Sequence, residues 1–185
     1  MRNLFCTFSI FLLAILFSDH AACQVATSGQ KKIILIRHAE KPQEGNNLSC
    51  MGLNRALQLA DVISNKFGKV NSILVPALNN GKSTNQARMF QTITPYAVKE
   101  NMDINTKFNV TNIQDVARTL QNMTGSTLVV WEHNGIEKIV KTLGIAEKLK
   151  WDANDFDSIW IITWENGAPV LTKDAEHIKP GATCN

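Results

Sequence analysis

The side chains best suited to chemistry in this sequence are two arginines and two histidines that lie far apart in the chain. Arg37 and His38 directly follow the apolar run 33–36. His133 follows a second apolar run, and Arg88 opens a segment with helical spacing. A guanidinium group donates paired, charge-assisted hydrogen bonds to phosphate oxygens, and a neutral imidazole can attack phosphorus. Brought together, these four side chains would form a pocket for a dianionic phosphoryl group.

Strands and helices are expected to alternate along the chain, as is typical of an α/β domain with a largely parallel sheet. Short β-branched apolar runs predict strands, and apolar residues at three- and four-residue steps predict helices. Asn166-Gly167 is a typical hairpin turn between the last two strands. We expect a three-layer sandwich with a mostly parallel central sheet flanked by helices. The expected strands are 32–37, 72–76, 127–131, 158–164 and 169–172, with a weaker one at 104–108, and the expected helices are 52–67, 85–99, 112–123 and 136–143.

A parallel sheet would place the polar groups at one edge. The carboxyl ends of such strands border the ligand crevice, and polar residues at 37–41 and 132–134 follow two of the expected strands. A helix N-terminus favours anions, and Arg88 adds a permanently charged donor there. Each feature alone is more often an ordinary surface group, so the inference depends on their combination. The expected substrate-binding residues are Arg37, Glu40, Lys41, Arg88, His133 and Asn134.

Three motifs, in this order, resemble the histidine phosphatase (phosphoglycerate mutase-like) superfamily. They are the strand that ends in Arg37-His38-Ala39-Glu40-Lys41-Pro42, Arg88 ahead of Gln91-Thr92, and the strand that leads to His133. The first is similar to the form found in small bacterial members, and the resemblance spans residues 33–143. It implies a histidine phosphatase-like fold and a metal-independent phosphoric monoester hydrolase. In that scheme His38 is the nucleophile that becomes phosphohistidine, Arg37 and Arg88 bind the phosphate, and His133 is the second pocket histidine.

The sequence departs from the family pattern at the general acid. The family usually has a glycine before the second histidine, whereas this chain has Glu132. Glu132 is either the acid that protonates the leaving oxygen or a carboxylate that weakens phosphate binding by repulsion. Glu40 is another candidate for the acid, because it lies close after the nucleophile. The segment in which the family usually carries its acid offers Glu100, Asp103 and Asp115.

Arg55 belongs to a further motif that resembles the family. Residues 52–56 read Gly-Leu-Asn-Arg-Ala and resemble the Gly-x-x-Arg-Ala segment that opens the family's first helix. We expect Arg55 to have a structural role there rather than a catalytic one.

Three functions are weighed for this chain. The first is an exported phosphomonoesterase acting on a small phosphorylated substrate, and a mutase is less favoured because the chain is short. The second is a catalytically degenerate protein of the same fold that binds phosphorylated ligands, and the third is an interaction protein. The four histidines lack metal-ligand spacing, and no P-loop or dinucleotide-binding glycine pattern occurs in the sequence, so neither a metal nor a cofactor is expected.

The N-terminal residues indicate export. Residues 1–23 have the order of a signal peptide, and their apolar run is shorter than the ~20 residues of a transmembrane anchor. We expect a short leader at 24–30, a single domain at 31–185, a secreted or periplasmic location and no stable membrane insertion after signal removal. The formal net charge of +3 argues against nucleic-acid partners. Cys50 and Cys184 are either a disulfide that joins the C-terminal tail to the loop after the first strand, or two free thiols.

Overall fold

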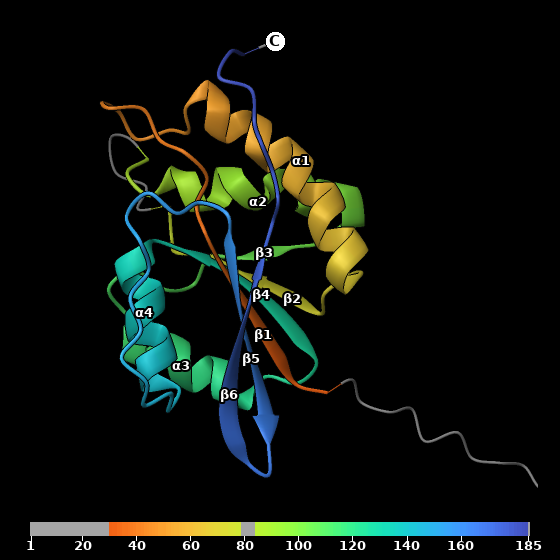
Figure 1. The fold of residues 1–185 in the computed structure, drawn as a ribbon, viewed down its shortest axis with the longest axis vertical. Coiled ribbons are helices and arrows are strands. Elements are labelled where there is room, and N and C mark those ends of the chain that lie inside the picture. Colours follow the sequence, from red (N-terminus) through yellow and green to blue (C-terminus); the bar gives the residue numbers. More distant parts are fainter. Residues whose placement is uncertain (1–29, 79–83, 185) are drawn as a thin grey trace, which may run out of the picture.

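The fold is a three-layer sandwich, described by a computed structural model for residues 30–78 and 84–184. Within these ranges six strands form one sheet in the order β3-β2-β4-β1-β5-β6. Figure 1 shows α1 and α2 on one side of the sheet and α3 and α4 on the other. The strands are β1 (Lys32–Arg37), β2 (Ser72–Leu74), β3 (Ile104–Asn105), β4 (Ser126–Trp131), β5 (Ser158–Glu165) and β6 (Ala168–Ala175), and the helices are α1 (Cys50–Phe67), α2 (Ala87–Glu100), α3 (Ile113–Asn122) and α4 (His133–Thr142).

The sheet is parallel over four of its strands and antiparallel at one edge. β1 pairs in parallel with β4, which is followed by β2 and then β3. On its other side β1 pairs antiparallel with β5, and β5 forms a hairpin with β6. Asn166 and Gly167 turn that hairpin with φ of 50° and 81°, as a type I′ turn requires. The predicted mostly parallel α/β fold is therefore confirmed, and so is the predicted hairpin.

β1 lies inside the sheet with both of its faces covered. Ile33 and Leu35 contact the core beneath α3 and α4, whereas Ile34 and Ile36 contact the core beneath α1 and α2. All four side chains are at most 1% exposed. A strand buried on both faces is apolar at every position, which explains the unbroken run before Arg37. The strand that carries the candidate nucleophile is thus held rigidly from both sides.

The helix and strand ends differ from the expected bounds by a few residues. The helix expected at 136–143 begins at His133, because the Glu132 side chain caps it by accepting a hydrogen bond from the backbone N–H of Asn134 at 3.0 Å. β2 ends at Leu74, although the next residue, Val75, still donates a backbone hydrogen bond to Asn105. Capping and edge pairing are tertiary details that apolar periodicity does not reveal.

A disulfide between Cys50 and Cys184 joins the start of α1 to the C-terminal end of the described chain, with 4.8 Å between the Cα atoms. Cys50 is the first residue of α1. The Asn54 side chain also donates hydrogen bonds to the backbone oxygens of Gly181 and Thr183, at 2.9 and 2.7 Å. The C-terminal tail therefore runs along the first half of α1 (Figure 1), and the first of the two alternatives for this cysteine pair is confirmed.

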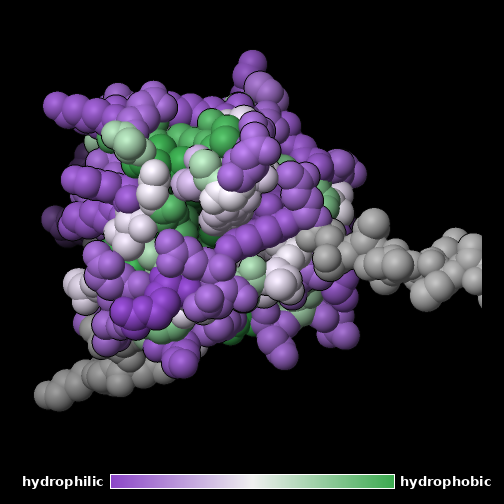
Figure 2. Space-filling view, turned by 90° about the horizontal axis from the view of Figure 1, so that it is seen from below, coloured by the Kyte–Doolittle hydropathy of each residue, from purple (hydrophilic) through white to green (hydrophobic). Residues whose placement is uncertain are grey.

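The end of the molecule that carries the β5–β6 turn is mostly hydrophilic. Figure 2 shows this end, with apolar surface gathered in one area and hydrophilic side chains around it. No helix across 30–78 and 84–184 is both long and apolar enough to cross a bilayer. The expected signal peptide (1–23) and most of the expected leader lie outside the described residues.

Candidate active site

His38 follows β1 at the carboxyl edge of the sheet, where its ring is held in one orientation. The residue is 4% exposed, and its backbone N–H donates to Trp131 at the end of β4. Its Nδ1 lies 2.7 Å from the carbonyl oxygen of Ala39. Because a carbonyl can only accept, Nδ1 must carry the proton, and in the neutral ring Nε2 then carries the lone pair. This is the tautomer that a nucleophilic imidazole requires.

The surroundings of His38 keep the ring uncharged. Burial lowers the pKa of His38 to about 4 against the opposing effect of the hydrogen bond to Ala39, and the electrostatic effects of Arg37, Arg88 and His133 add to the lowering. The imidazole is therefore neutral at neutral pH, and Nε2 is available for attack.

Arg37 is the last residue of β1, and its guanidinium is held by the loop before β5. Its Nη1 donates to the backbone oxygens of Ala153 and Asp155, at 2.7 and 3.1 Å. The guanidinium carbon lies 4.0 Å from the centroid of the Phe156 ring, and that ring lies 6.1 Å from the ring of His38. The Nε atom of Arg37 is buried and has no hydrogen-bond partner among the described residues. One donor of Arg37 is thus left to bind an anion.

Arg88 is the second residue of α2 and has the same pattern of one fixed donor and one unpaired donor. Its Nη2 donates to the backbone oxygen of Gly45 at 2.7 Å. Its Nε is buried without a hydrogen-bond partner in the described part of the chain. Thr92, 1% exposed, links this helix to the segment that follows β1, since its hydroxyl accepts from the Ala39 N–H at 2.9 Å and donates to the Arg88 carbonyl at 2.7 Å.

His133 and Glu132 occupy the turn from β4 into α4. His133 Nδ1 is buried, makes no hydrogen bond within the described ranges, and lies 3.9 Å from a Glu132 carboxylate oxygen. Gly135 permits this tight turn, because a Cβ atom there would lie 2.3 Å from the Trp131 ring and 3.1 Å from the other Glu132 oxygen. The turn therefore fixes the histidine and the carboxylate beside each other.

Three of the expected catalytic residues, His38, Arg88 and Glu132, line a cavity of about 40 Å³. Asn85, Gln86 and Met89, from the start of α2, complete its lining. Arg37 and His133 do not line it, yet both act electrostatically on His38. The chain thus brings a neutral imidazole, cationic donors and a carboxylate to one edge of the sheet, a combination that can bind a phosphoryl group and transfer it.

The other expected binding residues lie differently. Both oxygens of the Glu40 carboxylate accept from Arg55 Nε, at 2.9 and 3.0 Å, so this side chain is engaged away from the cavity. Lys41 is exposed and makes no hydrogen bond or ion pair with its side chain to another described residue, and Asn134 is exposed in the first turn of α4. Of the acid candidates on later segments, Glu100 accepts from Ser64 and Asp115 pairs with Arg118.

Sequence reasoning missed the loop that holds Arg37. Ala153 and Asp155 bind Arg37 through their backbone oxygens. Because every residue type has such an oxygen, the sequence does not indicate this role. Phe156 is a lone aromatic residue in a polar stretch, and only its position beside Arg37 and His38 could have indicated a role. Thr92 was part of a recognised motif, but its link to Ala39 depends on the tertiary arrangement.

No protein-family model matches this sequence, and no curated protein matches it. Solved structures do resemble the fold. The protein histidine phosphatase SixA complexed with tungstate has a TM-score of 0.63 at 14% identity, over 78% of this chain and 97% of that chain. A mutant phosphoserine phosphatase from Entamoeba histolytica in complex with phosphoserine has a TM-score of 0.54 at 17% identity, over 79% of this chain and 96% of that one. Phosphoglycerate mutase from Plasmodium falciparum has a TM-score of 0.53 at 15% identity, over 85% and 99%.

Proposed function

Because this chain has the histidine phosphatase fold, we propose that it is a phosphatase that hydrolyses small phosphate monoesters through phosphohistidine on His38. One observation carries the proposal: a buried, neutral imidazole with Nε2 unprotonated lies beside buried, unpaired nitrogen atoms of Arg37, Arg88 and His133. Buried polar groups in folded proteins nearly always have partners, so unpaired ones clustered at one site indicate a polar ligand. A phosphoryl group supplies oxygens for the two arginine donors, and for His133 Nδ1 when that nitrogen carries a proton.

The first step is transfer of the phosphoryl group to the protein. The Nε2 lone pair of His38 attacks phosphorus, the bond between phosphorus and the leaving oxygen breaks, and Glu132 donates a proton to that oxygen. Arg37, Arg88 and His133 offset the negative charge on the equatorial oxygens as it is redistributed. Glu132 suits the role of acid because it lines the same cavity as His38.

The second step returns His38 to its starting state. A water oxygen attacks the phosphorus of phosphohistidine, the phosphorus–nitrogen bond breaks, and the Glu132 carboxylate accepts a proton from the water. Inorganic phosphate then leaves. Each proton and electron pair in this cycle is supplied by the chain, the substrate or water.

The test is hydrolysis of p-nitrophenyl phosphate by the mature protein and by His38→Ala. We expect the substitution to abolish turnover, because it removes the atom that attacks phosphorus. A matched control is His177→Asn, which changes an exposed histidine at a backbone φ of 58° that asparagine also tolerates. Activity of His38→Ala equal to that of the unsubstituted protein would refute the proposed nucleophile.

A second candidate function is binding of phosphorylated ligands without turnover, and the presence of the Glu132 carboxylate in the cavity favours it. A rapid-quench experiment with labelled substrate under alkaline conditions distinguishes the two functions. A phosphatase of this mechanism acquires acid-labile phosphate on His38, whereas a protein that only binds its ligand acquires none. In both cases inorganic phosphate should raise the melting temperature.

The proposed phosphatase acts outside the cytoplasm, in the periplasm or the extracellular space. Two features support this location: the signal-peptide pattern of residues 1–23 and the disulfide between Cys50 and Cys184, a bond typical of oxidising compartments. Expression of the full sequence followed by mass spectrometry of the exported protein tests it. We expect an N-terminus near residue 23, and retention of the full-length chain inside the cell would contradict the proposed export.

A further inference from the structure

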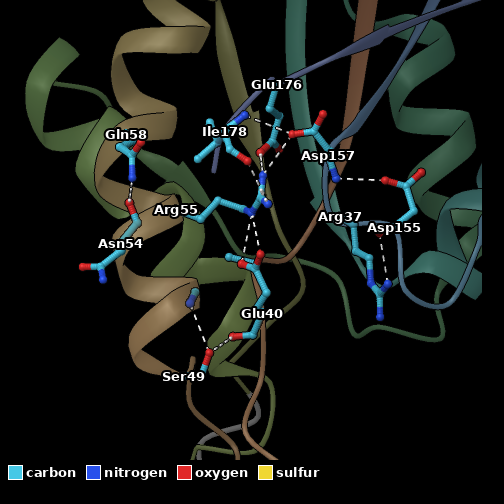
Figure 3. A network of polar contacts seen from close by, with 12 residues as sticks. Arg37, Glu40, Ser49, Asn54, Arg55, Gln58, Asp155, Asp157, Glu176 and Ile178 are labelled. Atoms are coloured by element: carbon cyan, nitrogen blue, oxygen red, sulfur yellow. Dashed lines mark hydrogen bonds and ion pairs between the residues drawn. The ribbon is translucent and has the colours of Figure 1, made fainter. Parts of the chain in front are cut away.

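Arg55 lies in the second turn of α1, outside the cavity, and contacts three carboxylates at once (Figure 3). The residue is 6% exposed. Its Nε donates to both oxygens of Glu40, and its Nη1 donates to Asp157 at 3.3 Å and to Glu176 at 2.7 Å. Its Nη2 donates more weakly to the Ile178 carbonyl at 3.4 Å. One side chain therefore links α1 to three segments that are distant in the sequence.

The first link leads to the nucleophile. Glu40 follows Ala39, whose carbonyl receives the Nδ1 proton of His38. The backbone oxygen of Glu40 also accepts hydrogen bonds from the N–H and the hydroxyl of Ser49, the cap of α1, at 2.9 and 3.2 Å. Glu40 is thus fixed both by its backbone and by its side chain. Fixing Glu40 fixes the preceding carbonyl that orients the imidazole.

The second link leads to the phosphate-binding arginine. Asp157 directly follows Phe156, and the carbonyl of Asp155 is one of the two that hold Arg37. The Asp157 carboxylate also accepts from the backbone N–H groups of His177 and Ile178, at 3.2 and 3.1 Å. The position of the Arg37 guanidinium therefore depends on a loop whose end is held by Arg55 and the C-terminal segment.

Stability alone does not explain such a cluster. Desolvation of buried charges offsets much of their mutual attraction, so apolar residues of similar volume often stabilise a fold equally well. Here burial raises the pKa of Glu176 to about 8 despite the opposing effect of Arg55, which shows how strongly desolvation acts at this position. What apolar residues cannot reproduce is the directional bonding to three separate segments.

We propose that Arg55 is a positioning residue for the phosphatase reaction: through Glu40 it sets the orientation of His38, and through Asp157 it sets the position of Arg37. This inference rests on the proposed function, and it assigns a different kinetic effect to each link. Loss of the Glu40 link should lower kcat, because attack by Nε2 requires alignment. Loss of the Asp157 link should raise KM, because Arg37 holds the phosphate.

The test uses isosteric variants, since removal of Arg55 itself would leave buried carboxylates without a partner and could prevent folding. We expect Glu40→Gln to lower kcat by about 10-fold with KM changed less than about twofold, a modest loss beside the ~10²-fold effect of a 1 Å misplacement. We expect Asp157→Asn to raise both KM and the inhibition constant of inorganic phosphate by about 10-fold, the effect of losing one well-placed charged donor. The matched control is Asp174→Asn, which removes an ion pair to Lys66 at 2.9 Å that also joins α1 to β6 but reaches neither link.

Two readouts without turnover separate this inference from the proposed function. NMR of the His38 imidazole reports its tautomer and pKa, which Glu40→Gln should shift, and calorimetry reports phosphate affinity, which Asp157→Asn should weaken. If the unsubstituted protein hydrolyses no phosphate ester, the proposed function fails, and these measurements still decide the positioning role. If both variants change only the melting temperature, as Asp174→Asn would, Arg55 is structural and the inference is overturned.

Discussion

At the scale of single residues, the candidate site depends on which nitrogen of His38 carries a proton. The hydrogen bond from Nδ1 to Ala39 leaves the lone pair on Nε2, and burial, together with the nearby Arg37 and Arg88 charges, lowers the pKa of His38. The sequence predicted the histidine but could not predict either effect, because both depend on a backbone carbonyl and on residues from other elements. Residue types therefore predict the candidate nucleophile, and the fold sets its tautomer and its pKa.

The lowered pKa of His38 gives a prediction for pH dependence. Protonation removes the nucleophilic lone pair, so activity should be retained below the ordinary histidine pKa of about 6.5 and lost only as pH falls through about 4. An NMR titration of the His38 ring should show the same midpoint, with the proton on Nδ1 at pH 7. The spectrum of His38→Asn assigns the signal. A midpoint near the ordinary value, or a proton on Nε2, would contradict the structure of the site.

Glu132→Gln distinguishes the two roles open to this carboxylate. If Glu132 is the general acid, kcat for an alkyl phosphate should fall by ~10²-fold or more, because a poor leaving group needs the proton. For p-nitrophenyl phosphate, whose leaving group is good, the loss should be much smaller. A comparison of kcat for the two substrates measures this directly. Tighter phosphate binding without loss of kcat would instead assign Glu132 the repulsive role.

At the scale of elements, the strands were predicted best where both faces are buried. β1 has the predicted bounds, Lys32–Arg37, because every one of its core residues is apolar. The start of α4 was predicted three residues too late, since Glu132 caps the helix with its side chain. From the sequence, this residue was interpreted as part of the site. The loop around Ala153 and Asp155 was not predicted as part of the site, because backbone oxygens do the binding.

The close contact between α1 and the backbone of Glu40 predicts the effect of Gly52→Ala. A Cβ atom at residue 52 would lie 2.2 Å from the backbone oxygen of Glu40, so the helix and that segment must move apart. We expect a loss of about 1 to 3 kcal/mol in the free energy of unfolding, as for other overpacked sites, together with a lower kcat. Chemical denaturation and steady-state kinetics measure the two effects. Gly181→Ala is the control, because its Cβ would meet only a side-chain atom at 3.7 Å, and equal effects of both substitutions would contradict this account.

At the scale of the whole molecule, the disulfide closes a long loop that contains most of the described chain, although β1 and His38 lie before it. Cys50 and Cys184 are separated by 134 positions in the sequence. A crosslink of this span restricts the unfolded chain strongly, whereas it adds little to the native contacts. Sequence spacing could suggest the pair, but only the course of the C-terminal tail along α1 shows that the two sulfurs meet.

Replacement of the cysteine pair should therefore affect stability more than chemistry. We expect Cys50→Ser with Cys184→Ser to lower the free energy of unfolding by about 2 to 5 kcal/mol, with kcat nearly unchanged well below the melting temperature. Urea denaturation of the oxidised, reduced and substituted proteins measures this. The reduced and substituted forms should agree, and a substituted protein as stable as the oxidised one would show that the crosslink does not stabilise the fold.

Arg37 and Arg55 are held by residues that follow them far along the sequence. Arg37 is held by carbonyls 116 and 118 positions further along the chain, and Arg55 binds a carboxylate 121 positions away. A nascent chain that ends before these residues contains the proposed nucleophile but not the contacts that hold the two arginines. If the proposed export takes place before the chain folds, the ability to hydrolyse phosphate esters would arise only at its destination, and phosphorylated metabolites in the producing cell would be spared.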